Sequence, residues 1–170
     1  MLNYMYDKFW RYIFLGEHEH FMREALKQAK KAYNKLEVPV GAVIVKNGKI
    51  IARAYNQKET KFDTTKHAEI LAIQKASKKL NSWRLIDCDL YVTLEPCPMC
   101  AGAIIQSRIR NVYYGVKDEK TGAVGSVLNL FDDYKFNHKP EFTSGILENE
   151  CKNLLQDFFK ALRKSKKKEN

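Results

Sequence analysis

Two short segments of the chain carry side chains with the chemistry and spacing of a metal site. The first is His67-Ala68-Glu69, and the second, thirty residues later, is Pro96-Cys97-Pro98-Met99-Cys100. Cys97 and Cys100 are three positions apart, so on a helix they share a face and can chelate one ion. Both are expected in the first turn of that helix, where the positive end of the helix dipole favours thiolates, the form that binds zinc.

His67 opens a second predicted helix and adds an imidazole nitrogen to the two sulfurs. Three protein ligands leave the fourth tetrahedral position of zinc to water, which is typical of a catalytic site and lowers the pKa of that water towards about 7. Glu69 projects near the metal without having to bind it. A carboxylate in that place can transfer protons, which contributes roughly 10²–10⁴ to the rate.

Two other interpretations of these residues remain open from the sequence. One is a structural zinc site with Cys88, Cys151 or His138 as the fourth ligand. Structural sites usually have a second closely spaced ligand pair, and H-x-E does not supply one. The other interpretation is a redox centre at the C-x-x-C pair. The spacing favours catalytic zinc.

The composition is that of one globular domain with a strong positive charge. The chain has 170 residues, of which 45% are hydrophobic and 29% charged, and its net charge is +10. That excess favours a polyanionic partner, either nucleic acid or an anionic membrane surface. No apolar run reaches the length of a membrane span or a secretory signal, so we expect no membrane partner and a cytoplasmic location.

The apolar periodicity predicts the elements that position these residues. Helices are predicted over 21–36, 67–80, 99–106 and along the stripe from Leu147 to Leu162, and strands over 40–45, 49–54, 90–94 and 112–115. Asn47-Gly48 predicts a hairpin turn, whereas 56–65 and 121–129 read as loops. Alternating strands and helices indicate an α/β domain with a mixed sheet of about five strands and helices on both faces. We divide the chain into an N-terminal extension (1–17), a single domain (18–163) and a basic tail (164–170).

The two segments also match the H-x-E…P-C-x-x-C signature of zinc nucleobase deaminases. The chain closely resembles one branch of the cytidine deaminase-like superfamily, the bacterial TadA-type tRNA-specific adenosine deaminases. The stretches that carry the resemblance are VPVGAVIV (38–45), HAEILAI (67–73), LYVTLEPCPMCAGAI (90–104), YGVKDEKTGAVGS (114–126) and NHK (137–139).

The resemblance implies a fold, an activity and roles for particular residues. The fold is the three-layer cytidine deaminase-like fold, and the activity is hydrolytic conversion of adenosine to inosine at the wobble position of a tRNA anticodon, usually that of arginine tRNA. The enzymes of this family are homodimers that bind the anticodon stem-loop, with one zinc ion in each subunit. By matching positions, His67, Cys97 and Cys100 are zinc ligands, Glu69 is the proton shuttle, and Asn56, Ala68, Pro96 and Asp118 contact the substrate.

This chain departs from the family pattern just before the histidine. The family commonly has Asp-Pro-Thr-Ala there, whereas this chain has Asp63-Thr64-Thr65-Lys66. The departure affects the expected grip on substrate rather than the chemistry. Two alternative functions remain: a deaminase of a free base or nucleoside, which needs no basic surface, and a non-catalytic, zinc-stabilised RNA-binding module.

Overall fold

A five-stranded sheet in the order β2-β1-β3-β4-β5 forms the middle layer of the protein. The computed structural model describes residues 2–133 and 135–167, with side chains for 16–133, 135–165 and 167. The elements are α1 (Leu2–Tyr33), β1 (Gly41–Lys46), β2 (Lys49–Tyr55), α2 (Lys58–Lys61), α3 (Ala68–Leu80), β3 (Cys88–Leu94), α4 (Pro98–Ser107), β4 (Asn111–Val116), β5 (Glu141–Ser144) and α5 (Glu148–Lys166).

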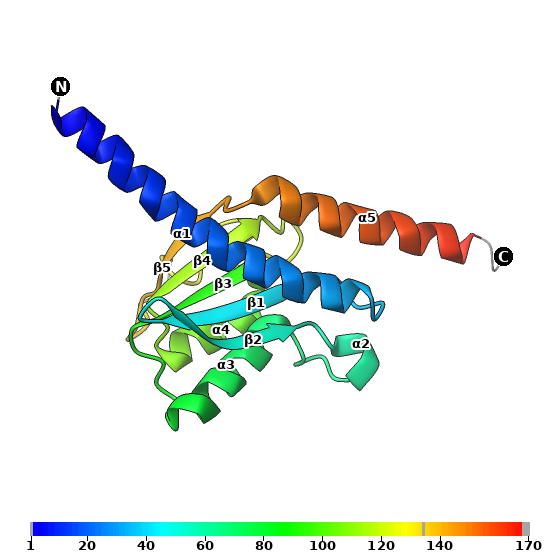
Figure 1. Cartoon of the computed structure of the whole chain (residues 1–170). Coiled ribbons are helices and arrows are strands. Elements are labelled where there is room, and N and C mark those ends of the chain that lie inside the picture. Colours follow the sequence, from blue (N-terminus) through cyan, green and yellow to red (C-terminus); the bar gives the residue numbers. More distant parts are fainter. Residues whose placement is uncertain (1, 134, 168–170) are drawn as a thin grey trace.

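The sheet is mixed, and helices cover both of its faces. β1 pairs antiparallel with β2 and β3, whereas β3, β4 and β5 run parallel. Helices α1 and α5 lie on one face, and α3 and α4 lie on the other (Figure 1). This is the predicted three-layer α/β arrangement. Because β3 and β4 run parallel, the carboxyl ends of both strands lie at the same end of the sheet.

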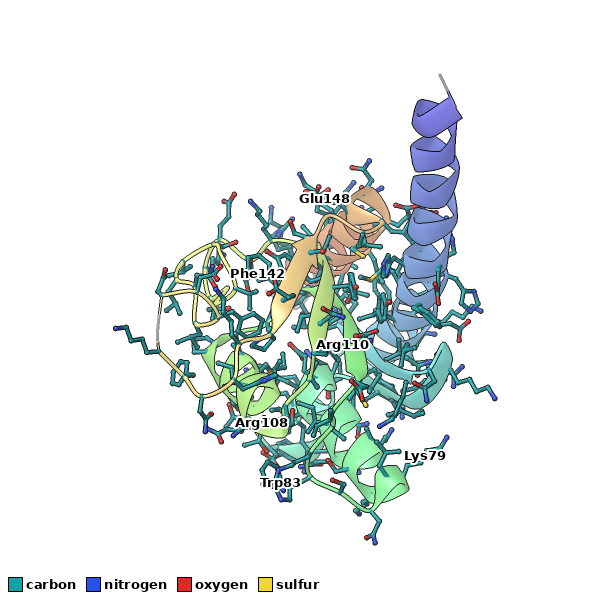
Figure 2. The ribbon with its side chains drawn as sticks, turned by 90° about the vertical axis from the view of Figure 1, so that its left-hand side faces the viewer. Lys79, Trp83, Arg108, Arg110, Phe142 and Glu148 are labelled. Atoms are coloured by element: carbon teal, nitrogen blue, oxygen red, sulfur yellow. The ribbon has the colours of Figure 1, made fainter. Side chains whose placement is uncertain are left out.

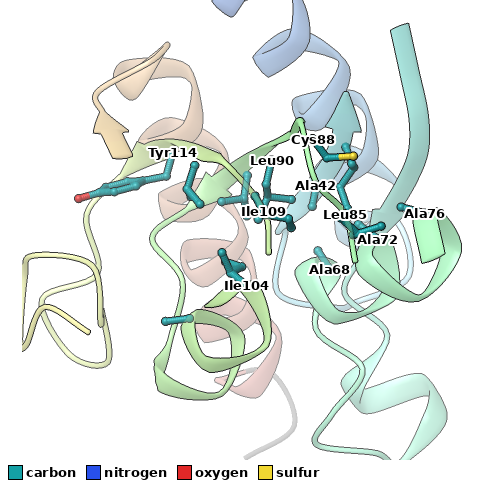
Figure 3. Close-up of a cluster of buried hydrophobic side chains, with 14 of the residues drawn as sticks. Ala42, Ala68, Ala72, Ala76, Leu85, Cys88, Leu90, Ile104, Ile109 and Tyr114 are labelled. Carbon is teal, nitrogen blue, oxygen red and sulfur yellow. The ribbon is translucent and has the colours of Figure 1, made fainter. Parts of the chain in front are cut away.

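Small side chains let α3 lie close to the sheet. Ala68, Ala72 and Ala76 follow one another at four-residue spacing, and all three are fully buried. Figure 3 shows them facing a cluster that contains Leu90 and Ala42 of the sheet. A methyl group at each turn allows a close approach without a gap, so the start of α3 is fixed relative to β1 and β3.

The opposite face of the sheet is packed with aromatic rings. Phe21 of α1 lies 5.1 Å, between ring centroids, from Tyr91 of β3. His18 stacks on Tyr113 with a 4.1 Å separation, and its Nδ1 lies 2.8 Å from the Tyr91 hydroxyl. Burial lowers the pKa of His18, which favours the neutral ring. The helix α1 runs unbroken across the predicted boundary at residues 17 and 18.

Three elements differ from the sequence predictions. Helix α1 ends at Tyr33 rather than 36, and Leu36 adopts φ 59° in the turn that follows. The polar stretch predicted as a loop over 56–65 contains the short helix α2. The edge strand β5 was not predicted, because its residues are mostly exposed and it has the single large apolar residue Phe142. Figure 2 shows Phe142 pointing away from α1, and its ring lies 6.2 Å from that of Phe131.

The chain ends lie partly outside the described residues. Residue 1 of the predicted extension and residues 168–170 of the predicted basic tail are outside that range, and α5 extends to Lys166. Among the helices that the structure describes, none combines the length and the apolar character needed to cross a membrane.

Candidate metal centre

Two helix N-termini meet at the predicted metal site. His67 is the N-cap residue of α3, and Cys97 is the N-cap residue of α4, with Pro98 at the start of that helix. Both caps have extended backbone angles, and neither side chain caps its own helix. The side chains are therefore free to point at a common ligand. The positive ends of both helix dipoles favour negative charge there.

The distances between the three predicted ligands fit a tetrahedral zinc ion. His67 Nδ1 lies 3.7 Å from Cys97 Sγ and 3.6 Å from Cys100 Sγ. Zinc bonds of about 2.3 Å to sulfur and 2.0–2.1 Å to nitrogen, held at the tetrahedral angle, place sulfur and nitrogen about 3.6 Å apart. The donor set of one imidazole and two thiols is also one that zinc favours.

This group has three members among the residues that the structure describes. The residues considered as a fourth ligand lie elsewhere: Cys88 begins β3, Cys151 is buried on α5, and His138 Nε2 lies 2.7 Å from the carbonyl oxygen of Ile109. Within the described part of the chain, the arrangement has the three-ligand form of catalytic zinc sites rather than the four-ligand form of structural ones.

Glu69 lies in the first turn of α3 and is buried, with 3% of its surface exposed. Its carboxyl group hydrogen bonds with the Cys100 thiol, so it is beside the ligand group. Burial raises the pKa of Glu69 to about 7. A carboxyl group with that pKa can both take and release a proton near neutral pH.

The two cysteines have opposite tendencies to ionise. A hydrogen bond from the Cys100 thiol lowers the pKa of Cys97 to about 4, with a further contribution from His67. The same contact raises the pKa of Cys100, as does its burial. A hydrogen bond to Cys97 raises the pKa of His67. Without a metal, a Cys97 thiolate beside a protonated His67 ring is therefore the favoured charge state, and His67 must lose its proton to bind a metal ion.

Asn56 joins this cluster through the start of α3. Its side-chain oxygen Oδ1 accepts a hydrogen bond of 2.9 Å from the backbone N–H of Ala68, between His67 and Glu69. Asn56 is 8% exposed. Because Oδ1 is engaged by the helix, the side-chain NH₂ is the group that can donate to a substrate. The structure thus brings the predicted residues Asn56, His67, Ala68 and Glu69 together with Cys97 and Cys100.

Pro96 and the Asp118 carboxylate accept hydrogen bonds from a separate segment, residues 118–126. The Pro96 carbonyl accepts a hydrogen bond from Ala123 N–H at 2.9 Å, which ties the segment of residues 118–126, called here the 118–126 loop, to the residue before Cys97. The Asp118 carboxylate accepts hydrogen bonds from Lys120, and from the backbone and side chain of Thr121. Asp118 therefore shapes its own loop.

Two buried glutamates beside the site were missed by the sequence analysis. Glu95 is 3% exposed and Glu37 is 1% exposed. The Glu95 carboxylate binds the 118–126 loop, whereas the Glu37 carboxylate accepts the backbone N–H groups of Glu59 and Thr60 at the start of α2. Glu95 follows an apolar strand directly, and that position was the available signal. Glu37 has no comparable local signal.

Charged side chains line two grooves between the 118–126 loop and α5. One groove of about 590 Å³ is bounded by residues 118–121 of the loop and by Lys152, Leu155 and Phe159 of α5, and its lining has as many acidic as basic side chains. A neighbouring groove of about 640 Å³ has five cationic side chains and one acidic one, Asp157; the cations are Lys117, Lys120, Lys152, Lys160 and Arg163. The second groove, with its excess of basic side chains, suits a polyanion with exposed rings.

Comparisons with known proteins agree with this geometry. Residues 16–163 match the MafB19-like deaminase family. The chain is 53% identical to the tRNA-specific adenosine deaminase of Bacillus subtilis (strain 168), over 90% of this chain and 95% of that protein.

Solved structures of deaminases superpose on the fold. A structure from a study of A-to-I editing by tRNA:A34 deaminases at the wobble position of transfer RNA has a TM-score of 0.78 and 47% identity, covering 80% of this chain and 99% of that one. A guanine deaminase from Bacillus subtilis has a TM-score of 0.59 and 36% identity, covering 86% and 94%. The fold is thus common to deaminases of tRNA and of a free base.

Proposed function

This chain belongs to the tRNA-specific adenosine deaminase family, and we propose that it converts adenosine to inosine at the wobble position of an arginine tRNA anticodon with one bound zinc ion. The observation that carries the proposal is the 3.6–3.7 Å spacing of His67 Nδ1 from both cysteine sulfurs, beside the buried carboxyl group of Glu69. The proposed domain is residues 18–163, flanked by the 1–17 extension and the 164–170 tail.

His67, Cys97 and Cys100 would hold the zinc ion, with Glu69 free of the metal. Zinc in such a site acts as a Lewis acid that lowers the pKa of a bound water. Glu69 takes the proton released from the attacking water and delivers it to N1 of the adenine ring. It then carries a second proton to the departing amine, so water is consumed and ammonia leaves while a carbonyl oxygen replaces the amine at C6.

The remaining residues would place the base rather than react with it. The Asn56 side-chain NH₂ donates to an acceptor on the base, because its oxygen is held by Ala68 N–H. The backbone near Ala68 and Pro96 forms the pocket edge, and Asp118 lies against the RNA backbone. The anticodon loop presents an unstacked base, which reduces the free energy needed to flip it into the site. We further propose a homodimer that acts on tRNA in the cytoplasm.

Incubation with unmodified arginine tRNA tests the activity. We expect inosine at the wobble position by sequencing, and no comparable turnover of free adenosine or guanine. Glu69→Ala should retain zinc and lose turnover, whereas Glu141→Gln, which changes an exposed carboxylate on β5, should keep both. Efficient deamination of a free base without tRNA would indicate the free-base alternative. Zinc and RNA binding without ammonia release would indicate the non-catalytic module.

Zinc content and oligomeric state are measured on the same preparation. Metal analysis should give one zinc per chain, and light scattering during size-exclusion chromatography should give twice the mass of one chain. A monomer that retains full activity would contradict the homodimer.

A further inference from the structure

The Glu95 carboxylate is saturated by hydrogen bonds from one loop. Its Oε1 accepts the backbone N–H groups of Val124 and Ser126, each at 3.0 Å. Its Oε2 accepts Asp118 N–H at 3.0 Å and the Ser126 hydroxyl. A carboxylate has about four lone-pair sites, so no acceptor capacity remains. Glu95 therefore differs from Glu69, and proton transfer or metal binding is not its role.

The loop is packed onto Glu95 as well as bonded to it. A Cβ atom on Gly122 would lie 2.5 Å from the Glu95 carboxylate oxygen Oε2 and 2.5 Å from the Asp118 carbonyl oxygen. The absence of a side chain at Gly122 is thus what lets the loop close around the carboxylate. Both ends of the contact are fixed, since one is backbone and the other is held by four hydrogen bonds.

The same loop also touches the residues that lead into the metal centre. The Pro96 carbonyl accepts Ala123 N–H of the loop at 2.9 Å, and Glu95 N–H donates at 2.9 Å to the carbonyl of Val116, the last residue of β4, two residues before the loop. Pro96 precedes Cys97, the N-cap of α4. On its outer side the loop forms one wall of the groove shared with α5. One buried side chain therefore connects the groove wall to the segment that carries two of the three ligands.

We propose that Glu95 is a positioning residue that fixes the 118–126 loop, and with it the RNA-binding wall of the site, before substrate arrives. This inference rests on the proposed function for the identity of the ligand. A loop fixed in advance loses less conformational entropy on binding, so the RNA binds more tightly than it would to a loop that must be ordered. Glu95 acts through the loop and Pro96 and does not itself touch the base.

Glu95→Gln tests the proposal because it keeps the shape of the side chain and removes two acceptor sites. The amide NH₂ group then faces two N–H or O–H donors, and it cannot accept a hydrogen bond from either. We expect the Kd for an anticodon stem-loop to rise at least about tenfold and KM to follow, with kcat changed less than about threefold. Hydrogen exchange should become faster at the Asp118, Val124 and Ser126 amides. Zinc content should stay at the wild-type value.

Glu141→Gln is the matched control, since Glu141 is an exposed glutamate on β5, outside the 118–126 loop and its grooves. Removing a negative charge from an RNA-binding protein strengthens electrostatic binding or leaves it unchanged. Glu141→Gln should therefore leave Kd unchanged or lower it. If only the loss of a negative charge mattered, Glu95→Gln would also leave Kd unchanged or lower it. The positioning role predicts the opposite, a rise in Kd. Wild-type Kd and wild-type amide exchange in Glu95→Gln would overturn the proposal.

Ser126→Ala covers the case in which Glu95→Gln does not fold. It removes the hydroxyl that donates to Glu95 while leaving the Ser126 N–H in place. We expect a rise in Kd of about two- to fivefold and faster exchange in the loop alone. Unchanged Kd and exchange in this variant would also overturn the proposal. Hydrogen exchange needs no RNA, so it tests the role of Glu95 in fixing the loop independently of the activity. A wild-type protein that fails to deaminate tRNA would refute the proposed function without changing the exchange result.

Discussion

Two segments flank the site, and each is held by one buried glutamate. Glu95 binds the 118–126 loop, and Glu37 binds the first turn of α2 through Glu59 N–H, Thr60 N–H and the Thr60 hydroxyl. The 118–126 loop is hydrogen bonded to Pro96, next to Cys97. The second segment, residues 57–66, contains α2 and is called here the α2 segment. Its two ends are joined by a hydrogen bond from Gln57 N–H to the carbonyl of Lys66, which precedes His67.

The two segments differ in whether a structural change in them is expected to affect substrate binding. The tip of the α2 segment projects into solvent, with Phe62 97% exposed in a left-handed conformation. Its base is stiffened locally, since Asp63 accepts hydrogen bonds from Thr65 and forms an ion pair with Lys66 at 3.4 Å. Thr64, which stands where the family commonly has proline, lies between the residues that make these contacts. We therefore expect disturbance on the Glu95 side to reach substrate binding, and disturbance on the Glu37 side to remain largely local.

The largest effect is expected at Cys97, which follows Glu95 and Pro96. Cys97→Ala removes a proposed zinc ligand at the start of α4, so zinc should be lost and deamination should fall to background. Cys88→Ala is the control, because that cysteine is buried at the start of β3 away from the ligand group. It should lower stability and retain zinc. Metal analysis and the inosine assay measure both, and stoichiometric zinc in Cys97→Ala would remove that residue from the ligand set.

Gly122→Ala should have the next largest effect, because its methyl group would collide with Glu95 and with the Asp118 backbone. The loop must shift, and misplacement of about 1 Å can reduce a rate by up to about 10²-fold. We expect kcat/KM on the stem-loop to fall about 10- to 100-fold with zinc retained. Gly16→Ala is the control, since nothing lies within 4 Å of the added methyl group. Full activity of Gly122→Ala would show that the wall is not rigid.

A smaller effect is expected from Glu37→Gln. Hydrogen bonds to charged groups contribute about 1.5–3 kcal/mol each to stability. The Glu37 carboxylate accepts three, and the amide of glutamine can still accept some of them. We expect a loss of about 1–2 kcal/mol in the free energy of unfolding by urea, with kcat/KM within about threefold of wild type. If kcat/KM falls as far as in Gly122→Ala, the two segments are equivalent and the comparison fails.

The proposed metal centre could be predicted from sequence because each half of it is a short motif with the residue types and spacing of metal ligands. H-x-E and P-C-x-x-C are recognisable separately, although they lie 30 and 33 residues apart, and the buried strands and hairpin follow from periodicity. The two glutamate contacts could not be predicted, because most of their partners are backbone N–H groups, which every residue except proline carries and which therefore leave no pattern in the sequence. The strand β5 was missed since its exposed residues give no apolar signal and its pairing with β4 defines it.

The smallest effect expected is a pH dependence confined to the Glu37 side. Burial raises the pKa of Glu37, but hydrogen bonds from Thr60 and Glu59 outweigh it and lower the pKa overall. A carboxyl group with a lowered folded pKa stabilises the protein fully above its unfolded pKa of about 4.3, and this stabilisation is lost as pH falls through the folded pKa. The stability difference between wild type and Glu37→Gln should therefore be constant from pH 8 to about pH 5 and shrink below about pH 4.3. Urea unfolding across that range measures it, with Glu141→Gln as the exposed-carboxylate reference. A difference that grows as pH falls would mean that Glu37 is protonated more readily in the folded protein than in the unfolded chain, and that its hydrogen bonds to α2 do not favour the charged form.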